Sequence, residues 1–227
     1  MADLQYYTPE PIWQGETAYV IGGGRSLLGF DFERLRGRHC IGCNDAYMLG
    51  DLLEVAHWGD QSWFALHWTD AVRMPDLSWK AGLKCFEGLK ITSTHTCYGV
   101  ADDVKVMRRV SEGLHYAPKL GWNGNTGSSA INLALVLGAK RVVLLGFDMQ
   151  AHGKFANWYI NLKLHGSDKL KNSDYYPSSY RRFASHHTAM CRDWHSKFAD
   201  RQIVNAGPIH SPLLDGFPCV DLDKELL

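Results

Sequence analysis

The sequence lacks an excess of charge of either sign. Its 227 residues hold 24 Lys and Arg against 24 Asp and Glu, so the formal net charge is zero. Tight nonspecific binding to nucleic acid or to an anionic membrane surface needs a surplus of basic residues. We therefore expect neither nucleic acid nor a membrane among the partners.

Long apolar runs are missing as well. Residues 1–5 are polar, and no apolar run approaches the roughly 20 residues that cross a membrane. We expect a cytoplasmic protein without a signal peptide. The hydrophobic share of 45%, with 12% aromatic residues, is enough for a packed core, and we expect a single domain over residues 1–227.

The six cysteines and the acidic residues form no convincing metal-binding pattern. Cys40 and Cys43 form a C-x-x-C within a predicted strand, where residues three apart face opposite sides of the sheet. That geometry opposes both chelation by the pair and a disulfide between them. Asp221 and Asp223 form a D-x-D in the C-terminal tail, which we interpret as surface charge. We expect no bound metal.

The sequence does contain a glycine-rich turn directly after an apolar strand-like run at 17–21. The turn reads Gly22, Gly23, Gly24, Arg25 and Ser26. It is no Rossmann fingerprint, since Leu27 stands where the third glycine belongs, and no Walker A loop, since Lys does not follow Gly29. Glycine lets a ligand approach the backbone closely, while Arg and Ser side chains can bind phosphate oxygens. The turn therefore predicts a phosphate contact, with a plain tight turn as the alternative.

A second glycine turn opens a predicted helix over 127–137. It runs from Asn123 and Gly124 to Ser129, and its candidate ligand-binding residues are Asn125, Thr126, Gly127 and Ser128. These residue types cap a helix N-terminus, and capping alone is one interpretation. The other is an anion site, because a helix start offers free N–H groups and a partial positive charge. The number of donors beside a glycine favours the anion site, and two such turns together indicate a nucleotide.

The order of elements predicts the fold. Predicted strands fall at 17–21, 39–43, 55–58, 83–86, 90–93, 104–109, 141–145 and 202–205, and helical stretches at 32–36, 46–49, 61–69, 127–137 and 178–198. Strands that alternate with helices indicate an α/β domain, here a Rossmann-like, doubly wound, mostly parallel sheet. Residues 150–177 have no periodic apolar face, and we expect them to form a lid loop over the site.

Several further polar residues belong to the predicted site. Asn44, Asp60 and Asp148 each follow a predicted strand, and ligands of such sheets bind beyond the carboxyl ends of the strands. His186 and His187 lie in the predicted helix after the lid. Neighbouring helical residues point about 100° apart, so we expect at most one of the two to face the site as a general base.

Four segments, taken in order, resemble one superfamily. They are residues 20–27, 43–45, 125–130 and 144–149. The superfamily contains the bacterial CMP-sialic-acid-dependent sialyltransferases and the archaeal-type 6-hydroxymethyl-dihydropterin pyrophosphokinases, with phage and prophage proteins that share their domain. The chain looks most similar to the phage proteins. The resemblance covers residues 17–148 and, more loosely, His187 and Asn205.

The sialyltransferase likeness implies a metal-independent glycosyltransferase with a nucleotide-sugar donor. It implies that the first turn, Asn44 and the Thr-Gly-Ser helix start hold the nucleotide, with Asp148 near the ribose and base. It makes His187 or His186 the base that deprotonates an acceptor hydroxyl. This sequence departs from the family where Gly24, Arg25 and Ser26 replace Gly-Pro-Ser, and its Tyr159, Tyr175, Tyr176 and Tyr180 do not align securely with the family's lid tyrosines.

Two other functions stay open. A pyrophosphokinase would use ATP and Mg²⁺, with Asp60 and Asp148 as the best candidate metal ligands. A non-catalytic nucleotide-binding phage protein would bind a ligand without turnover. No further cofactor is implied by the sequence.

Overall fold

The computed structural model describes residues 5–73, 78–150, 157–159, 175–207 and 214–226, with side chains of 175–179 left aside. Its centre is a seven-stranded sheet in the order β11-β10-β1-β2-β3-β6-β7, in which all pairs are parallel. The strands of this sheet are β1 (Thr17–Ile21), β2 (His39–Cys43), β3 (Val55–Trp58), β6 (Leu89–Thr92), β7 (Val104–Val106), β10 (Arg141–Leu145) and β11 (Gln202–Asn205). The prediction of an α/β domain with a parallel sheet is confirmed.

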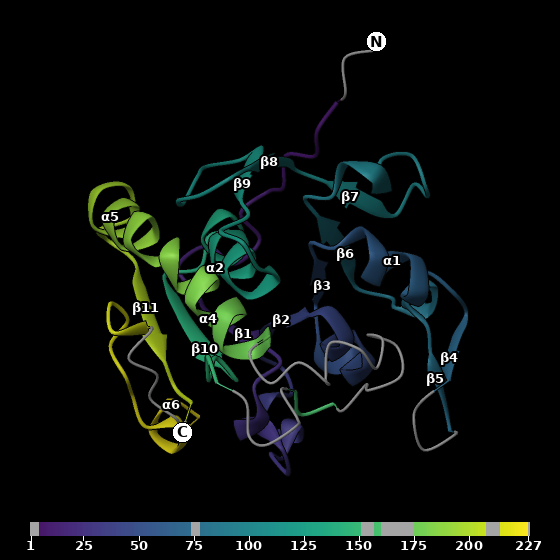
Figure 1. The fold of residues 1–227 in the computed structure, drawn as a ribbon, viewed down its shortest axis with the longest axis horizontal. Helices are drawn as coiled ribbons and strands as arrows, with labels where there is room; N and C mark the ends of the chain where they lie inside the picture. The colour runs from purple at the N-terminus through teal and green to yellow at the C-terminus, as the bar shows by residue number, and fades with distance from the viewer. Residues whose placement is uncertain (1–4, 74–77, 151–156, 160–174, 208–213, 227) are drawn as a thin grey trace.

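Both faces of the sheet are covered, as alternating side chains on each strand require. One face packs against α2 (Thr126–Val136) and α5 (His187–Lys197), and the other against α1 (Gln61–His67) and short 3-10 turns. In Figure 1 the sheet runs from β11 on the left to β7 on the right, with α2 in front. Cys40 and Cys43 lie in the cores of opposite faces and are free thiols, as the strand geometry predicts.

Two small sheets and the remaining helices complete the described part of the chain. β4 (Ala71–Arg73) pairs with β5 (Trp79–Ala81), and β8 (Arg108–Val110) pairs with β9 (Lys119–Gly121). The helices α4 (Tyr175–Ser185) and α6 (Leu222–Glu225) lie in the C-terminal part, and 3-10 helices span Arg25–Leu27, Phe32–Leu35, Asn44–Leu52, Leu83–Cys85 and His95–Cys97. Asp221 caps α6 and Asp223 pairs with Arg34 at the surface, so the D-x-D serves structure.

Three predicted elements are wrong in type or extent. Residues 83–86 form a 3-10 helix at Leu83–Cys85, and Leu83 and Phe86 are buried while the two residues between them are exposed. That period of three fits a 3-10 turn better than a strand. The predicted edge strand 104–109 is split into β7 and β8, because the chain changes its pairing partner: β7 pairs with β6 in the central sheet, and β8 pairs with β9.

The predicted helix 178–198 is two helices, α4 and α5, that join at His186. Before the junction the Ser185 hydroxyl donates a hydrogen bond to the Arg182 carbonyl, a local bond of the type that bends helices. Most of the predicted lid falls at 151–156 and 160–174, outside the described residues. Residues 175–177 belong to α4, so the loop prediction is wrong there.

Candidate functional site

The candidate site lies where the strand order reverses. From β1 the chain adds β2, β3, β6 and β7 on one side, whereas β10 and β11 lie on the other. β1 and β10 are therefore the neighbours at the crossover, and the first glycine turn and Gly146–Asp148 extend from their carboxyl ends. Ligands of open α/β sheets bind at this position. Because all the strands are parallel, Asn44 and Asp60 lie on the same edge.

The turns after β1 and β10 are joined by hydrogen bonds. The Gly24 amide donates to the Gly146 carbonyl at 2.8 Å, and the Ser26 amide to Asp148 Oδ2 at 2.7 Å. Ser26 Oγ donates to Asp148 Oδ1, and the Gly22 amide donates to Leu145. The amides of Gly22, Gly24 and Ser26 are therefore already used inside the protein, by the last residue of β10 and by the turn that follows it, and are not available to a ligand.

Close approach of the two turns explains two of the glycines. A Cβ on Gly22 would lie 2.7 Å from the Gly146 carbonyl oxygen. A Cβ on Gly24 would lie 2.5 Å from the same oxygen and 2.6 Å from Asp148 Cγ. All three distances are shorter than the 3.0 Å that real Cβ contacts keep, so neither position accommodates a larger residue without a shift of its neighbours.

The Phe147 ring lies between the two glycine turns. A Cβ on Gly22 would meet this ring at 3.2 Å, and a Cβ on Gly127 would meet it at 2.9 Å. The ring is 6% exposed. The structure thus brings the two predicted turns to the same edge of the sheet, one aromatic ring apart. The sequence analysis did not predict that this ring belongs to the site. The signal that could have indicated it was an aromatic residue between Gly146 and Asp148.

The second turn combines a helix cap with unused donors. Asn125 Oδ1 accepts from the Ser128 amide at 2.8 Å, and Asn125 Nδ2 donates to Ser128 Oγ at 2.9 Å. These two residues therefore cap α2, as the alternative interpretation has it. The amides of Gly23, Thr126 and Gly127 donate to no acceptor among the described residues. In the same part of the chain, the Thr126 hydroxyl is buried without a partner.

Residues with left-handed backbone gather at this edge. Asn44 has φ 52°, Asn123 has φ 51° and Met149 has φ 48°. Asn44 directly follows β2, Met149 follows the β10 turn, and Asn123 precedes α2. Such conformations are uncommon outside glycine and are concentrated at functional sites. The Asn44 Oδ1 atom is also buried without a hydrogen bond in the described structure.

The described piece of the predicted lid lies directly on the first turn. The Trp158 amide donates to the Gly23 carbonyl at 3.0 Å and Trp158 Nε1 donates to the Gly22 carbonyl at 2.9 Å. Arg25 Nη1 lies 3.5 Å from the Asn157 carbonyl oxygen. A Cβ on Gly23 would meet the Tyr159 hydroxyl at 2.9 Å. Trp158 stands in a polar stretch, so no periodic signal in the sequence marks it.

The two adjacent histidines have different surroundings. A Cβ on Gly124, in the second turn, would lie 3.1 Å from His186 Cδ2. His187 packs edge-on against Phe217, and its Nε2 lies 3.5 Å from Cys191 Sγ. Burial lowers the pKa of His187 below its ordinary value. His186 is therefore the histidine beside a predicted turn, whereas His187 faces the C-terminal segment.

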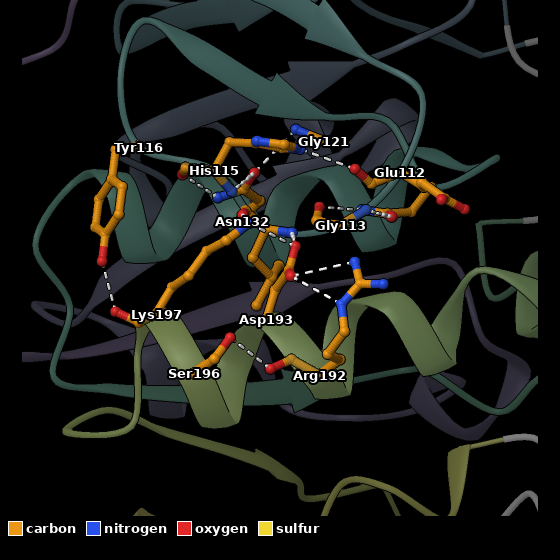
Figure 2. A network of polar contacts seen from close by, with 12 residues as sticks. Glu112, Gly113, His115, Tyr116, Gly121, Asn132, Arg192, Asp193, Ser196 and Lys197 are labelled. Atoms are coloured by element: carbon orange, nitrogen blue, oxygen red, sulfur yellow. Dashed lines mark hydrogen bonds and ion pairs between the residues drawn. The ribbon is translucent and has the colours of Figure 1, made fainter.

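A carboxylate lies beside His186, on an anchored loop. Glu112 Oε2 is 3.5 Å from His186 Nδ1. As Figure 2 shows, Asn132 of α2 and Asp193 of α5 hold the backbone around Gly113 and His115 that follows Glu112. The carboxylate thus extends from backbone that buried side chains fix in place.

Asp60 and Asp148 are too far apart to share one cation. Asp60 follows β3 and Asp148 follows the β10 turn, with β1 and β2 between those strands. Three strand spacings amount to about 14 Å, whereas Mg²⁺ ligands lie about 2 Å from the ion. The strand spacing therefore argues against one metal ion bound by both carboxylates, whereas each carboxylate separately stays a candidate ligand. No group of three His, Cys, Asp or Glu suited to a metal ion occurs within the described residues.

The described helices include none that is both long and apolar enough to span a bilayer.

Comparison with known proteins does not assign the chain to a family. No protein-family model, no curated protein and no solved structure matches the chain.

Proposed function

We propose that the crossover between β1 and β10 binds a nucleotide-sugar, and that the protein is a metal-independent glycosyltransferase of the sialyltransferase-like kind. The observation that carries the proposal is the set of unused donors on both glycine turns at this crossover. They are the amides of Gly23, Thr126 and Gly127 and the buried Thr126 hydroxyl. Buried polar groups normally have partners, so these donors indicate a ligand with anionic oxygens.

The phosphate of the donor is assigned to the space outside the Phe147 ring. The first turn of α2, an 11-residue helix, supplies amides and the positive end of its dipole. The Gly23 amide follows Gly22, whose position packs on the same ring, and the Tyr159 hydroxyl approaches Gly23. Asn44 Oδ1 accepts a hydrogen bond from the nucleoside at the adjacent strand end. Arg25, on the first turn, supplies positive charge.

The general base is assigned to His186, because it is the histidine beside the second turn. Its Nε2 takes the proton of an acceptor hydroxyl, whose oxygen attacks the anomeric carbon of the donor sugar. The bond from that carbon to the phosphate oxygen breaks, and the phosphate keeps the electron pair. Glu112 at 3.5 Å from Nδ1 stabilises the imidazolium that forms. His187, packed on Phe217, positions the C-terminal segment instead.

A thermal-shift screen tests the binding half of this proposal. CMP, UDP, GDP, ADP and their sugar conjugates are added in the presence of EDTA, and a ligand that binds the folded state raises the melting temperature. We expect one nucleotide class to do so, and Thr126→Val to reduce the shift. Ser196→Ala, which removes an exposed hydroxyl within α5, is the control. If no member of the panel raises the melting temperature, the proposal is refuted.

Two histidine variants test the catalytic half. His186→Gln should abolish release of the nucleotide from the donor while leaving the thermal shift intact, and His187→Gln should keep most turnover. If His187→Gln abolishes turnover and His186→Gln keeps most of it, the assignment of His186 as the general base is contradicted. Binding of ATP that requires Mg²⁺ would instead favour a pyrophosphokinase, and binding without turnover of any donor would favour a non-catalytic nucleotide-binding protein.

A further inference from the structure

Arg109 on β8 reaches the carboxyl ends of β3 and β6, away from the crossover. Its Nη2 donates to the Gly59 carbonyl at 2.5 Å and to Thr94 Oγ1 at 3.3 Å. Its Nε donates to Ser93 Oγ at 3.2 Å. All three acceptors are neutral, so they fix the position of the guanidinium without neutralising its charge.

The guanidinium keeps unused capacity for an anion. Among the described residues no carboxylate oxygen lies within 4.0 Å of it, and Nη1 donates to no acceptor. The side chain is half-buried, and this burial lowers the pKa of Arg109 below its ordinary value. Removing a cation from water without a counter-ion is costly. The exposed Asp60 nearby offsets only part of that cost.

An aromatic ring holds the guanidinium in one orientation. Arg109 Cζ lies 4.2 Å from the centre of the Trp122 ring. The ring in turn presses on the end of β3, since a Cβ on Gly59 would lie 1.7 Å from Trp122 Cζ3. Stacking on an aromatic ring is favourable for a guanidinium and leaves its edge free. Glycine at position 59 is thus required by the ring that supports Arg109.

A buried polar atom with an unused hydrogen-bonding position lies on the same face of β3 as Gly59. His57, two residues before Gly59, is 1% exposed, and its Nδ1 lies 2.8 Å from the Ile91 carbonyl oxygen. A carbonyl only accepts, so Nδ1 carries the proton and Nε2 is an acceptor, one without a partner in the described structure. Burial, followed by the charge of Arg109, lowers the pKa of His57 to about 4. His57 is therefore a neutral acceptor on the strand that leads to Gly59, and the charge of Arg109 acts on it.

We propose that Arg109 and Trp122 form an anion-binding site, which takes the carboxylate or phosphate group of a small molecule at the ends of β3 and β6. It is separate from the crossover, because β2 lies between β1 and β3 and two strand spacings amount to about 10 Å. The anion accepts from Nη1, and a hydroxyl of the same molecule or a water donates to His57 Nε2. This inference does not depend on the nucleotide proposal.

Titration of the labelled protein with simple anions tests the site. Inorganic phosphate and malonate are added separately at constant ionic strength, and NMR follows the Trp122 indole and Arg109 Nε–H signals. We expect saturable shifts with at least one anion, and the anion that saturates identifies phosphate or carboxylate as the preferred group. Shifts that are absent or never saturate overturn the proposal.

Matched variants separate recognition from a structural role. Arg109→Lys keeps the positive charge but loses the planar guanidinium with its several N–H donors. It should weaken anion binding at least tenfold. Arg108→Lys makes the same change at the adjacent exposed residue, whose side chain has no hydrogen bond in the described structure, and should leave affinity unchanged. If Arg109→Lys lowers the melting temperature but not the affinity, Arg109 is structural and the proposal fails.

Removal of a neighbouring negative charge gives a test that leaves Arg109 in place. Asp60→Asn, at an exposed position, takes away the charge that acts on Arg109 and should tighten anion binding severalfold. Because the exposed side chain makes no cap hydrogen bond to α1, the variant should fold normally. Unchanged or weaker binding in Asp60→Asn contradicts the proposal even if Arg109→Lys fails to fold.

Discussion

Replacement of Asn132 by alanine should cost the protein a large share of its stability. The side chain is fully buried in α2, and its amide group makes hydrogen bonds to backbone groups as another peptide unit would. Its Oδ1 accepts from the His115 amide at 3.0 Å and from the Gly121 amide at 2.8 Å, and its Nδ2 donates to the His115 carbonyl at 2.8 Å. Figure 2 shows these bonds joining the helix to His115, which lies between β8 and β9, and to Gly121 at the end of β9. Alanine leaves the partners buried and unpaired.

The magnitude follows from these three bonds. At about 1 kcal/mol net for each bond, Asn132→Ala loses about 3 kcal/mol, and each kcal/mol lowers the melting temperature of a chain this long by about 2–4 °C. We therefore expect a decrease of about 6–12 °C by calorimetry, with faster hydrogen exchange at the Gly121 amide. Ser196→Ala, an exposed hydroxyl that bonds only within its own helix, should change stability by less than about 0.5 kcal/mol. An Asn132→Ala melting point equal to that of Ser196→Ala would refute the reasoning.

Three further predictions concern stability. The pKa of His57, lowered by burial to about 4, lies below the unfolded value of about 6.5, so stability should fall by about 1.4 kcal/mol per unit as the pH drops between these values. Urea unfolding of His57→Gln should show a flatter pH dependence there, and an unchanged slope contradicts this. Burial opposes ionisation of Asp193, but Lys197 and the Leu114 amide outweigh it and hold the pKa of Asp193 below its ordinary value. Its contribution should therefore be complete above about pH 4 and disappear as the pH falls through the native pKa, a loss absent from Asp193→Asn. Gly24→Ala should lose more than about 2 kcal/mol by urea unfolding, because its Cβ meets backbone at 2.5 Å; a wild-type midpoint would show that the turn can open.

Parts of the site were predictable because they depend on local pattern. The turns at Gly22 and Asn125 follow from a strand end and a helix start, and both kinds of signal lie within a few residues. The sequence does not say that the Gly24 amide and Asp148 are used to join two turns. That depends on β1 and β10 being neighbours, although more than a hundred residues separate them. The choice between His186 and His187 depends on a helix junction that periodicity does not reveal.

The sequence alone determined which residues form five of the seven central strands: the buried runs at Thr17–Ile21, His39–Cys43, Val55–Trp58, Arg141–Leu145 and Gln202–Asn205 have the predicted bounds. It also determined that these strands share a covered parallel sheet, because each is apolar on both faces. Only the tertiary structure decided their order, the Phe147 ring between the turns and the stacking of Arg109 on Trp122. Apolar periodicity specifies that a segment must be buried, whereas the choice of partner is made by packing between segments distant along the chain.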